Sequence, residues 1–108
     1  MCAPSFNETW IIEAGDAVIL KQAREGIGSL SPLERLTYCV WVADYGMRNA
    51  GDLDTAHHVY ANFQTEAAQL AHALRLQATH DAFALPTADL QLQYFERFDK
   101  ICDEIRFA

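Results

Sequence analysis

Apolar residues recur at three- and four-residue spacing along most of this chain, which is the period of an α-helix with one buried face. The spacing is most regular over residues 54–77 and predicts one helix there, bent or broken near Thr65. Its apolar face comprises Ala56, Val59, Tyr60, Phe63, Ala67, Leu70, Ala71, Leu74 and Ala78. The segment His80–Leu85 should be a connection, because Pro86 disfavours helix at the residue before it.

A last helix is predicted to end at about Arg106, with Thr87 or Asp89 as the cap at its start. It carries an apolar stripe that should face the core. The stripe comprises Leu90, Tyr94, Phe95, Phe98, Ile101, Cys102 and Ile105.

The stretch LTYCVWVADYGM, residues 36–47, is almost entirely apolar and predicts a helix at the centre of a bundle. Ser31 can cap this helix, with Pro32 at the first helical position and Glu34 closing a capping box. The central helix should therefore begin at Pro32.

The central helix should end at about Arg48, because Asn49-Ala50-Gly51 provides a stop signal. Asp52 or Asp54 should then cap the next helix through its carboxylate. The link between these two helices is accordingly short.

Residues 7–25 allow two interpretations. The first is a helix capped by Ser5 or Asn7. Its buried face would comprise Ile11, Ala14, Val18 and Ile19. The second is a short hairpin that turns at Gly15-Asp16, between the β-branched runs WII and AVIL. Gly26 ends the element in either case, because glycine accepts left-handed dihedral angles without strain.

Taken together, the pattern predicts an all-α fold, a compact bundle of four to five helices around an apolar central helix. The 108 residues suffice for one hydrophobic core and fit a single helical domain over residues 1–108. With 51% hydrophobic and 21% charged residues, the composition is that of a globular domain rather than of a disordered chain.

The chain is acidic, with 15 Asp and Glu against 8 Lys and Arg and a net charge of −7. This charge repels phosphate backbones and anionic lipid surfaces, so we expect no direct binding to nucleic acid or to a membrane. It attracts a basic protein surface, including one that normally binds nucleic acid. Solubility alone is the competing explanation for the acidity.

The three cysteines, Cys2, Cys39 and Cys102, include no CxxC pair and leave one over, so neither a zinc knuckle nor a disulfide framework is indicated. Cys39 and Cys102 lie among apolar residues and should be core thiols. The first residues lack the basic start and apolar run of a signal peptide, and no segment approaches the about 20 apolar residues that cross a bilayer. These features predict a cytoplasmic protein.

One strip of the central helix mixes charge with aromatic rings. Trp41 lies within the strip, and Tyr38 and Tyr45 lie on its border. The rings either pack against a neighbouring helix or form a partner-binding patch, of which a homodimer seam is one form. The polar members are Glu34, Thr37, Asp44 and Arg48. Asp44 and Arg48 should form an exposed ion pair, because four residues separate them.

Acidic residues recur along one flank of the last helix. Asp89, Glu96 and Asp103 follow at seven-residue steps, with Asp99 beside them. This flank is either an ordinary solvated face or a binding surface. In the second case its carboxylates, about 6 to 10 Å apart, take the place of phosphates for the Lys and Arg side chains of a partner.

Candidate chemistry is sparse. Asp54, His57 and His58 open the predicted third helix, and Asp54 and His58 share one face. A metal site would need a further ligand from Asn62, His72, His80 or a distant carboxylate, and no recognised spacing supports one. The sequence contains no nucleotide-binding glycine motif, no zinc-protease motif and no support for a serine triad. It therefore predicts no metal site, no cofactor and no enzymatic activity.

Two segments, YCVWVADYGMRNAGDLDTAHHVYANF (residues 38–63) and YFERFD (residues 94–99), resemble a family of acidic all-helical bacterial proteins that includes a DNA mimic from Neisseria. Members show a Trp-bearing helix, an acidic residue, and an Asn-Gly-Gly-type break before an aromatic-rich helix. Here the break is Arg48-Asn49-Ala50-Gly51-Asp52, with Ala for the first Gly. The resemblance implies a non-enzymatic protein, dimeric in one version, whose carboxylates occupy a basic site on a DNA-binding partner.

We therefore predict a non-enzymatic module that inhibits or antagonises a basic protein partner, either a DNA-binding protein or a toxin. The predicted contact residues are Asp89, Glu96, Asp99, Asp103, Asp44, Trp41, Tyr38 and Tyr45. The alternative function is an immunity protein that neutralises a cognate bacterial toxin. A third class is an enzyme or metal-binding protein that uses Asp54, His57 and His58.

Overall fold

A computed structural model describes residues 6–108 of the chain. These residues form six α-helices, one 3₁₀ turn and no β-strand, which confirms the all-α class with more helices than the four to five predicted. The elements are α1 Phe6–Glu25, η1 Ile27–Ser29, α2 Pro32–Ala50, α3 Asp54–Val59, α4 Phe63–Ala73, α5 Gln77–Phe83 and α6 Thr87–Arg106. Ser5 and Cys2 lie outside the described residues.

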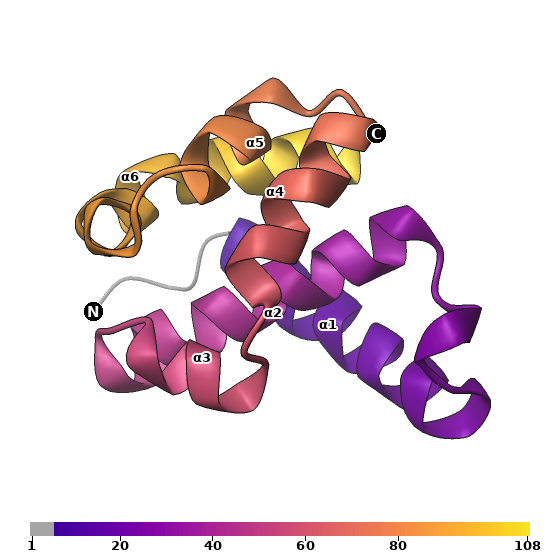
Figure 1. Ribbon diagram of the computed structural model, residues 1–108. Coiled ribbons are helices and arrows are strands. Elements are labelled where there is room, and N and C mark those ends of the chain that lie inside the picture. The colour runs from indigo at the N-terminus through magenta and orange to yellow at the C-terminus, as the bar shows by residue number, and fades with distance from the viewer. Residues whose placement is uncertain (1–5) are drawn as a thin grey trace.

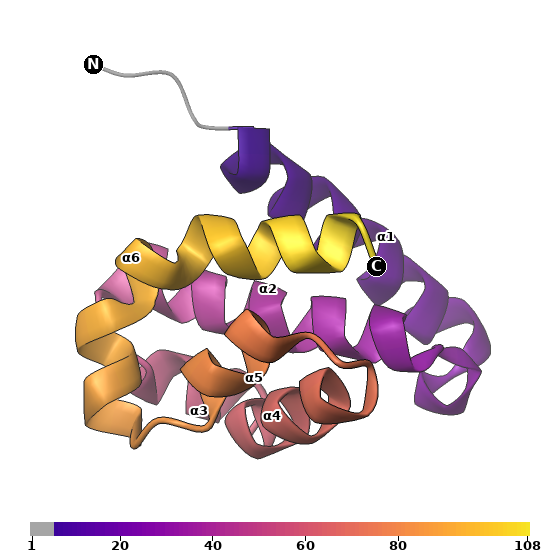
Figure 2. The same ribbon diagram turned by 90° about the horizontal axis from the view of Figure 1, so that it is seen from above.

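The α2 helix contacts α1, α3, α4 and α6 (Figure 1). Seen from above, α6 runs alongside α2, and α1 crosses them obliquely (Figure 2). All six helices contribute side chains to one hydrophobic cluster, in which Tyr94, Phe63 and Phe83 are the largest fully buried residues. Within residues 6–108, no helix combines the length and the apolar character that crossing a membrane requires.

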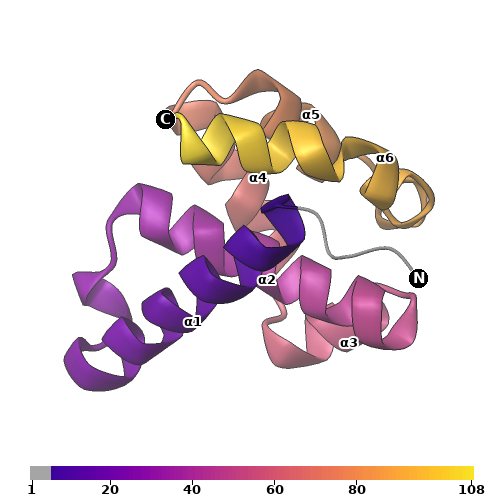
Figure 3. The same ribbon diagram turned by 180° about the vertical axis from the view of Figure 1, so that it is seen from behind.

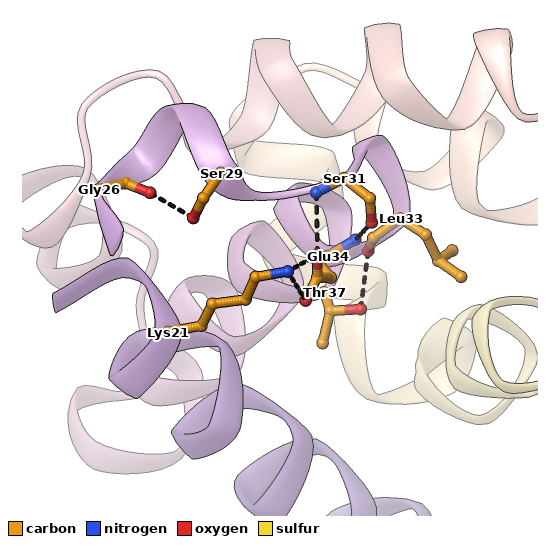
Figure 4. A network of polar contacts seen from close by, with 7 residues as sticks. All are labelled: Lys21, Gly26, Ser29, Ser31, Leu33, Glu34 and Thr37. Atoms are coloured by element: carbon orange, nitrogen blue, oxygen red, sulfur yellow. Dashed lines mark hydrogen bonds and ion pairs between the residues drawn. The ribbon is translucent and has the colours of Figure 1, made fainter. Parts of the chain in front are cut away.

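The start of α2 is the capping box predicted from the sequence. Ser31 Oγ accepts a hydrogen bond from the Glu34 backbone N–H at 3.1 Å, and Glu34 Oε1 accepts one from the Ser31 backbone N–H at 2.9 Å. Lys21 of α1 donates to the same carboxylate at 3.0 Å, so the cap also ties α1 to α2 (Figure 4). Gly51 ends α2 in a left-handed conformation, with φ of 74°, as predicted.

The first helix, α1, is continuous, so the hairpin interpretation of Gly15-Asp16 is wrong. Gly15 is buried against α2 instead. A Cβ built on Gly15 would lie 2.9 Å from the Cβ of Trp41, closer than real Cβ atoms approach. The glycine therefore serves close packing of two helices and not a turn.

The region predicted as one helix over residues 54–77 is broken. Tyr60 has an extended backbone, with φ of −150°, and ends α3; α4 then begins at Phe63, so the break falls before Thr65. The Asp52 carboxylate accepts a hydrogen bond from the Thr55 backbone N–H at 3.1 Å, so Asp52 rather than Asp54 supports the start of α3.

The α5 helix occupies much of the segment expected to be a connection, so that prediction is wrong. No side chain next to α5 in the sequence caps it. Instead, Glu104 of α6 accepts hydrogen bonds from the backbone N–H groups of Ala78 and Thr79, at 2.9 and 2.7 Å. Because the cap comes from a distant helix, the local sequence gives no sign of where α5 begins.

The α6 helix has nearly the predicted bounds, but neither Thr87 nor Asp89 caps it through a side chain. The Thr87 hydroxyl donates instead to Gln64 of α4 at 2.9 Å. The predicted apolar stripe is buried except for Phe95, which is 52% exposed. Phe95 therefore belongs to the surface of the molecule.

Candidate functional site

The outward side of α6 combines acidic and large apolar side chains. The four acidic residues predicted on this flank of α6 are all exposed, namely Asp89, Glu96, Asp99 and Asp103. Leu92 is 80% exposed and lies one turn from Asp89 and from Glu96, while Phe95 is 52% exposed. We call this surface the α6 face. It consists of Asp89, Leu92, Phe95, Glu96, Asp99 and Asp103.

The acidic residues of the α6 face differ in their contacts. Asp99 and Asp103 accept hydrogen bonds from Asn7 Nδ2 at 3.0 and 3.2 Å, and Asp103 lies 3.3 Å from Arg106. Within the described residues, Asp89 and Glu96 form no ion pair and no hydrogen bond through their side chains. The N-terminal half of the α6 face therefore carries uncompensated negative charge.

Half of the basic residues form ion pairs with carboxylates, and three of these four bind carboxylates outside the α6 face. Lys21 pairs with Glu34 at 3.0 Å. Arg35 pairs with Glu66 at 2.7 Å. Together with Arg48 and Arg106, which also form ion pairs, four of the eight basic residues bind carboxylates within residues 6–108. The acidic residues outside these pairs still outnumber the basic residues outside them, so the charge away from the ion pairs is negative.

Asp44, one of the predicted contact residues, is only 4% exposed, so in the expected exposed pair with Arg48 the carboxylate is in fact buried. Its carboxylate accepts hydrogen bonds from Tyr94 Oη at 2.8 Å and from Arg48 Nε at 3.0 Å. Burial raises the pKa of Asp44, an effect that the Tyr94 hydrogen bond and the Arg48 charge oppose. Thr37 is buried as well, and its hydroxyl donates to the Leu33 carbonyl. Asp44 therefore lies beneath the surface that a partner would contact.

Arg48 also connects the aromatic strip of α2 with α6. Its guanidinium carbon lies 5.1 Å from the ring centre of Phe95, and its Nη1 lies 3.0 Å from Glu8 of α1. A cation so placed is attracted by the face of the ring and by the carboxylate together. Arg48 thus holds Phe95 in place on the edge of the α6 face.

The predicted aromatic strip is a stack of rings. The centres of Tyr38 and Trp41 are 6.2 Å apart, and those of Trp41 and Tyr45 are 5.5 Å apart. Tyr38 and Trp41 are half-buried and Tyr45 is 43% exposed, and the binding of a partner at this strip stays a prediction. Tyr38 and Trp41 form the floor of an apolar groove of about 390 Å³ between α1 and α3.

A larger groove of about 680 Å³ lies between the start of α2 and α4. Its charged residues, Arg35 and Glu66, bind each other, and Tyr60 donates a hydrogen bond to the same Glu66 carboxylate. These contacts raise the pKa of Tyr60, chiefly through the hydrogen bond to Glu66. The two charged side chains of this groove are therefore paired with each other.

The residues considered for chemistry do not converge. No group of three or more His, Cys, Asp or Glu side chains able to hold a metal occurs among residues 6–108. The His57 ring packs against Phe63, with 4.8 Å between ring centres. Cys39 and Cys102 are buried, and burial raises the pKa of both thiols, that of Cys102 to about 12. Such thiols are not activated as nucleophiles.

Leu92 and Phe95 are exposed beside the acidic residues of α6, whereas Asp44, one of the predicted contact residues, is buried. Leu92 lies on the polar side of α6 in the sequence pattern, which was a detectable signal. Phe95 carried no such signal, because it follows the spacing of the buried stripe. No protein-family model, curated protein or solved structure matches this chain.

Proposed function

We propose that the protein is a non-enzymatic binding module whose α6 face docks on a basic surface of a partner protein and blocks it. One observation carries the proposal. Asp89 and Glu96 stand exposed beside Leu92 without an ion pair in the described part of the chain, although Lys21, Arg35 and Arg48 are bound to carboxylates elsewhere in the fold. A DNA-binding protein and a toxin are the two partner classes that we propose.

The α6 face has the chemistry that recognition of a basic surface requires. Asp89, Glu96 and Asp103 succeed one another at about 10 Å along the helix, within reach of several Lys or Arg side chains at once. Leu92 and Phe95 add apolar area that becomes buried on contact, which supplies affinity that charge alone does not. The carboxylates then determine orientation and association rate.

The test begins with capture of a partner from the native cytosol by the full chain, followed by measurements with the purified partner. Association should slow steeply as salt concentration rises, because steering acts between exposed charges. The double variant Asp89→Lys/Glu96→Lys should weaken binding by about a hundredfold or more, as expected when two contacts of hot-spot strength are lost.

The matched control is Glu25→Lys/Asp54→Lys, which makes the same change in net charge at exposed positions on other helices. It should keep most of the affinity. An equal loss of affinity in both double variants would show that only the net charge of the protein matters, and it would refute a specific role of the α6 face. Retention of affinity in Asp89→Lys/Glu96→Lys would refute the proposal outright.

A further inference from the structure

A second surface lies on a different side of the molecule from α6. Residues from three helices line the apolar groove of about 390 Å³. The floor is formed by Tyr38 and Trp41 of α2, and the walls by α1 and by Val59 of α3. In the view from behind, α3 and α6 lie on opposite sides of α2 (Figure 3). A partner in this groove would therefore leave the α6 face free.

The groove is fixed in shape by its own packing. Trp41 is held between Tyr38 and Tyr45 by ring stacking, and its side chain rests on Gly15 with no space for even a methyl group. Tyr38 is supported in turn by Tyr60, with 5.6 Å between ring centres. A ligand would meet a preformed aromatic floor, and binding would cost little ordering of the protein.

Exposed apolar side chains continue the groove beyond its floor. Ile12 of α1 is 51% exposed, and Tyr45 and Val59 are each 43% exposed. Ile12 and Ile19 are seven residues apart and so lie on one side of α1. Tyr38 and Tyr45 are seven residues apart on α2, so the floor and its continuation at Tyr45 together extend for about 10 Å, or about two turns of a helix. A bound helix would place apolar residues at i, i+3, i+4 and i+7 along such a floor.

The unpaired charge on α1 beside the groove is acidic. At its two ends, Lys21 binds Glu34 and Arg48 binds Glu8, so both cations are neutralised. Asp16 lies between Ile12 and Ile19 on the same side of α1, is exposed, and forms no ion pair among the described residues. The rim of the groove is therefore complementary to positive charge.

From this apolar floor and acidic rim we infer that the groove binds an amphipathic helix of a partner protein, with its apolar face on Trp41 and basic residues along its flank. The inference is independent of the proposed function of the α6 face. The two surfaces have different compositions, since aromatic rings dominate the groove and carboxylates dominate α6.

The test uses synthetic peptides as probes for the full-length chain. The first peptide has leucines at i, i+3, i+4 and i+7 and lysines on its flank. The second peptide has glutamines in place of the lysines. The third peptide has the composition of the first, with the leucines at scrambled positions. Fluorescence anisotropy of labelled peptides should rank the affinities in that order, with the scrambled peptide at least about tenfold weaker than the first.

Variants then locate the bound peptide. Val59→Glu introduces a charge at a partly exposed wall position, and it should weaken binding of the lysine peptide by about tenfold or more. Leu92→Glu makes the same kind of change on the α6 face and should leave the affinity unchanged. Asp16→Asn should weaken binding of the lysine peptide a few-fold and leave that of the glutamine peptide as it was.

Each contrary outcome overturns the inference. Loss of binding in Leu92→Glu with retention in Val59→Glu would place the peptide on α6. Equal affinity for the scrambled peptide would show attraction by charge alone. A concentration-dependent doubling of mass in light scattering, abolished by Val59→Glu, would show that a second copy of this chain covers the groove.

Discussion

The side chain of Trp41 lies directly on Gly15, and this contact sets the distance between α1 and α2. Any Cβ at position 15 would meet the Trp41 Cβ at 2.9 Å and the indole ring more closely still. Since α1 and α2 are also joined at their ends by Lys21–Glu34 and Glu8–Arg48, the indole has little freedom to withdraw.

Gly15→Ala should therefore destabilise the protein despite the higher helix propensity of alanine. We expect a loss of about 1–3 kcal/mol in the free energy of unfolding, measured by urea denaturation, because overpacking of a close contact costs that much. Gly28→Ala is the control, since a Cβ there meets nothing within 4 Å. If Gly15→Ala is as stable as the wild type, the described contact is wrong.

Removal of the Glu104 carboxylate should loosen α5. Glu104→Ala leaves the N–H groups of Ala78 and Thr79 without acceptors, and loss of a helix cap costs about 0.5–2 kcal/mol. Hydrogen exchange should accelerate at the start of α5 before other helices respond. Glu96→Ala, on the same helix but without an internal partner, should change neither stability nor exchange at α5.

Position 75 should gain stability from glycine. Arg75 lies two residues after the end of α4 and has a positive φ of 61°, a conformation that residues other than glycine adopt at a cost of about 1–2 kcal/mol. Arg75→Gly should raise the free energy of unfolding by up to about 1 kcal/mol, after the entropic cost of glycine in the unfolded chain is subtracted. Arg97→Gly, within α6, should instead lower it by about 1 kcal/mol.

The buried Asp44 should make stability dependent on pH. Burial raises its pKa above the ordinary value of 3.8, so the folded protein binds this proton more tightly than the unfolded chain does. Relative to Asp44→Asn, the wild type should thus lose stability as pH rises from about 3.8 through the raised pKa of the folded state.

Tyr94→Phe provides the companion variant for Asp44. It removes a hydrogen bond that lowers the pKa of Asp44, so the decline in stability should extend to higher pH. Urea denaturation at a series of acidic pH values measures the free energy of unfolding of both variants. If the free energy of unfolding of the wild type and of Asp44→Asn changed with pH in parallel, the raised pKa of Asp44 would be contradicted.

The two core cysteines should be unreactive in the folded state. Burial raises the pKa of the Cys39 thiol, and raises that of Cys102 to about 12. In a Cys2→Ser variant, a thiol reagent at mildly alkaline pH should label the protein only as fast as it unfolds. Rapid labelling of either cysteine under native conditions would show that the core around it is open.

The sequence predicted the elements whose signals are local. The ends of α2 are determined by the capping box of Ser31 and Glu34 and by the glycine stop at Gly51. Each signal involves residues within four positions of one another, so it can be recognised in the sequence alone. The spacing of apolar residues likewise revealed α6. Signals of this kind need no knowledge of the fold.

What the sequence missed depends on contacts between distant helices. The cap of α5 is Glu104, and the polar residue Asp44 is buried because Tyr94 and Arg48 satisfy it. Phe95 follows the period of a buried stripe yet lies at the surface, where Arg48 covers it from α2. Helical periodicity orients a residue on its own helix but does not report what the neighbouring helices cover.

The Arg106 side chain contacts both the start of α1 and the end of α6. Its guanidinium donates to the Asn7 side chain at 2.8 Å and lies 4.3 Å from the ring centre of Phe6 and 4.9 Å from that of Phe107. Asn7 and Arg106 are 99 positions apart in the sequence, so the first turn of α1 gains these contacts only once the end of α6 is in place. Removal of the Arg106 side chain would therefore take these contacts from the first turn of α1, while the Glu8–Arg48 ion pair would still join that end of the helix to α2.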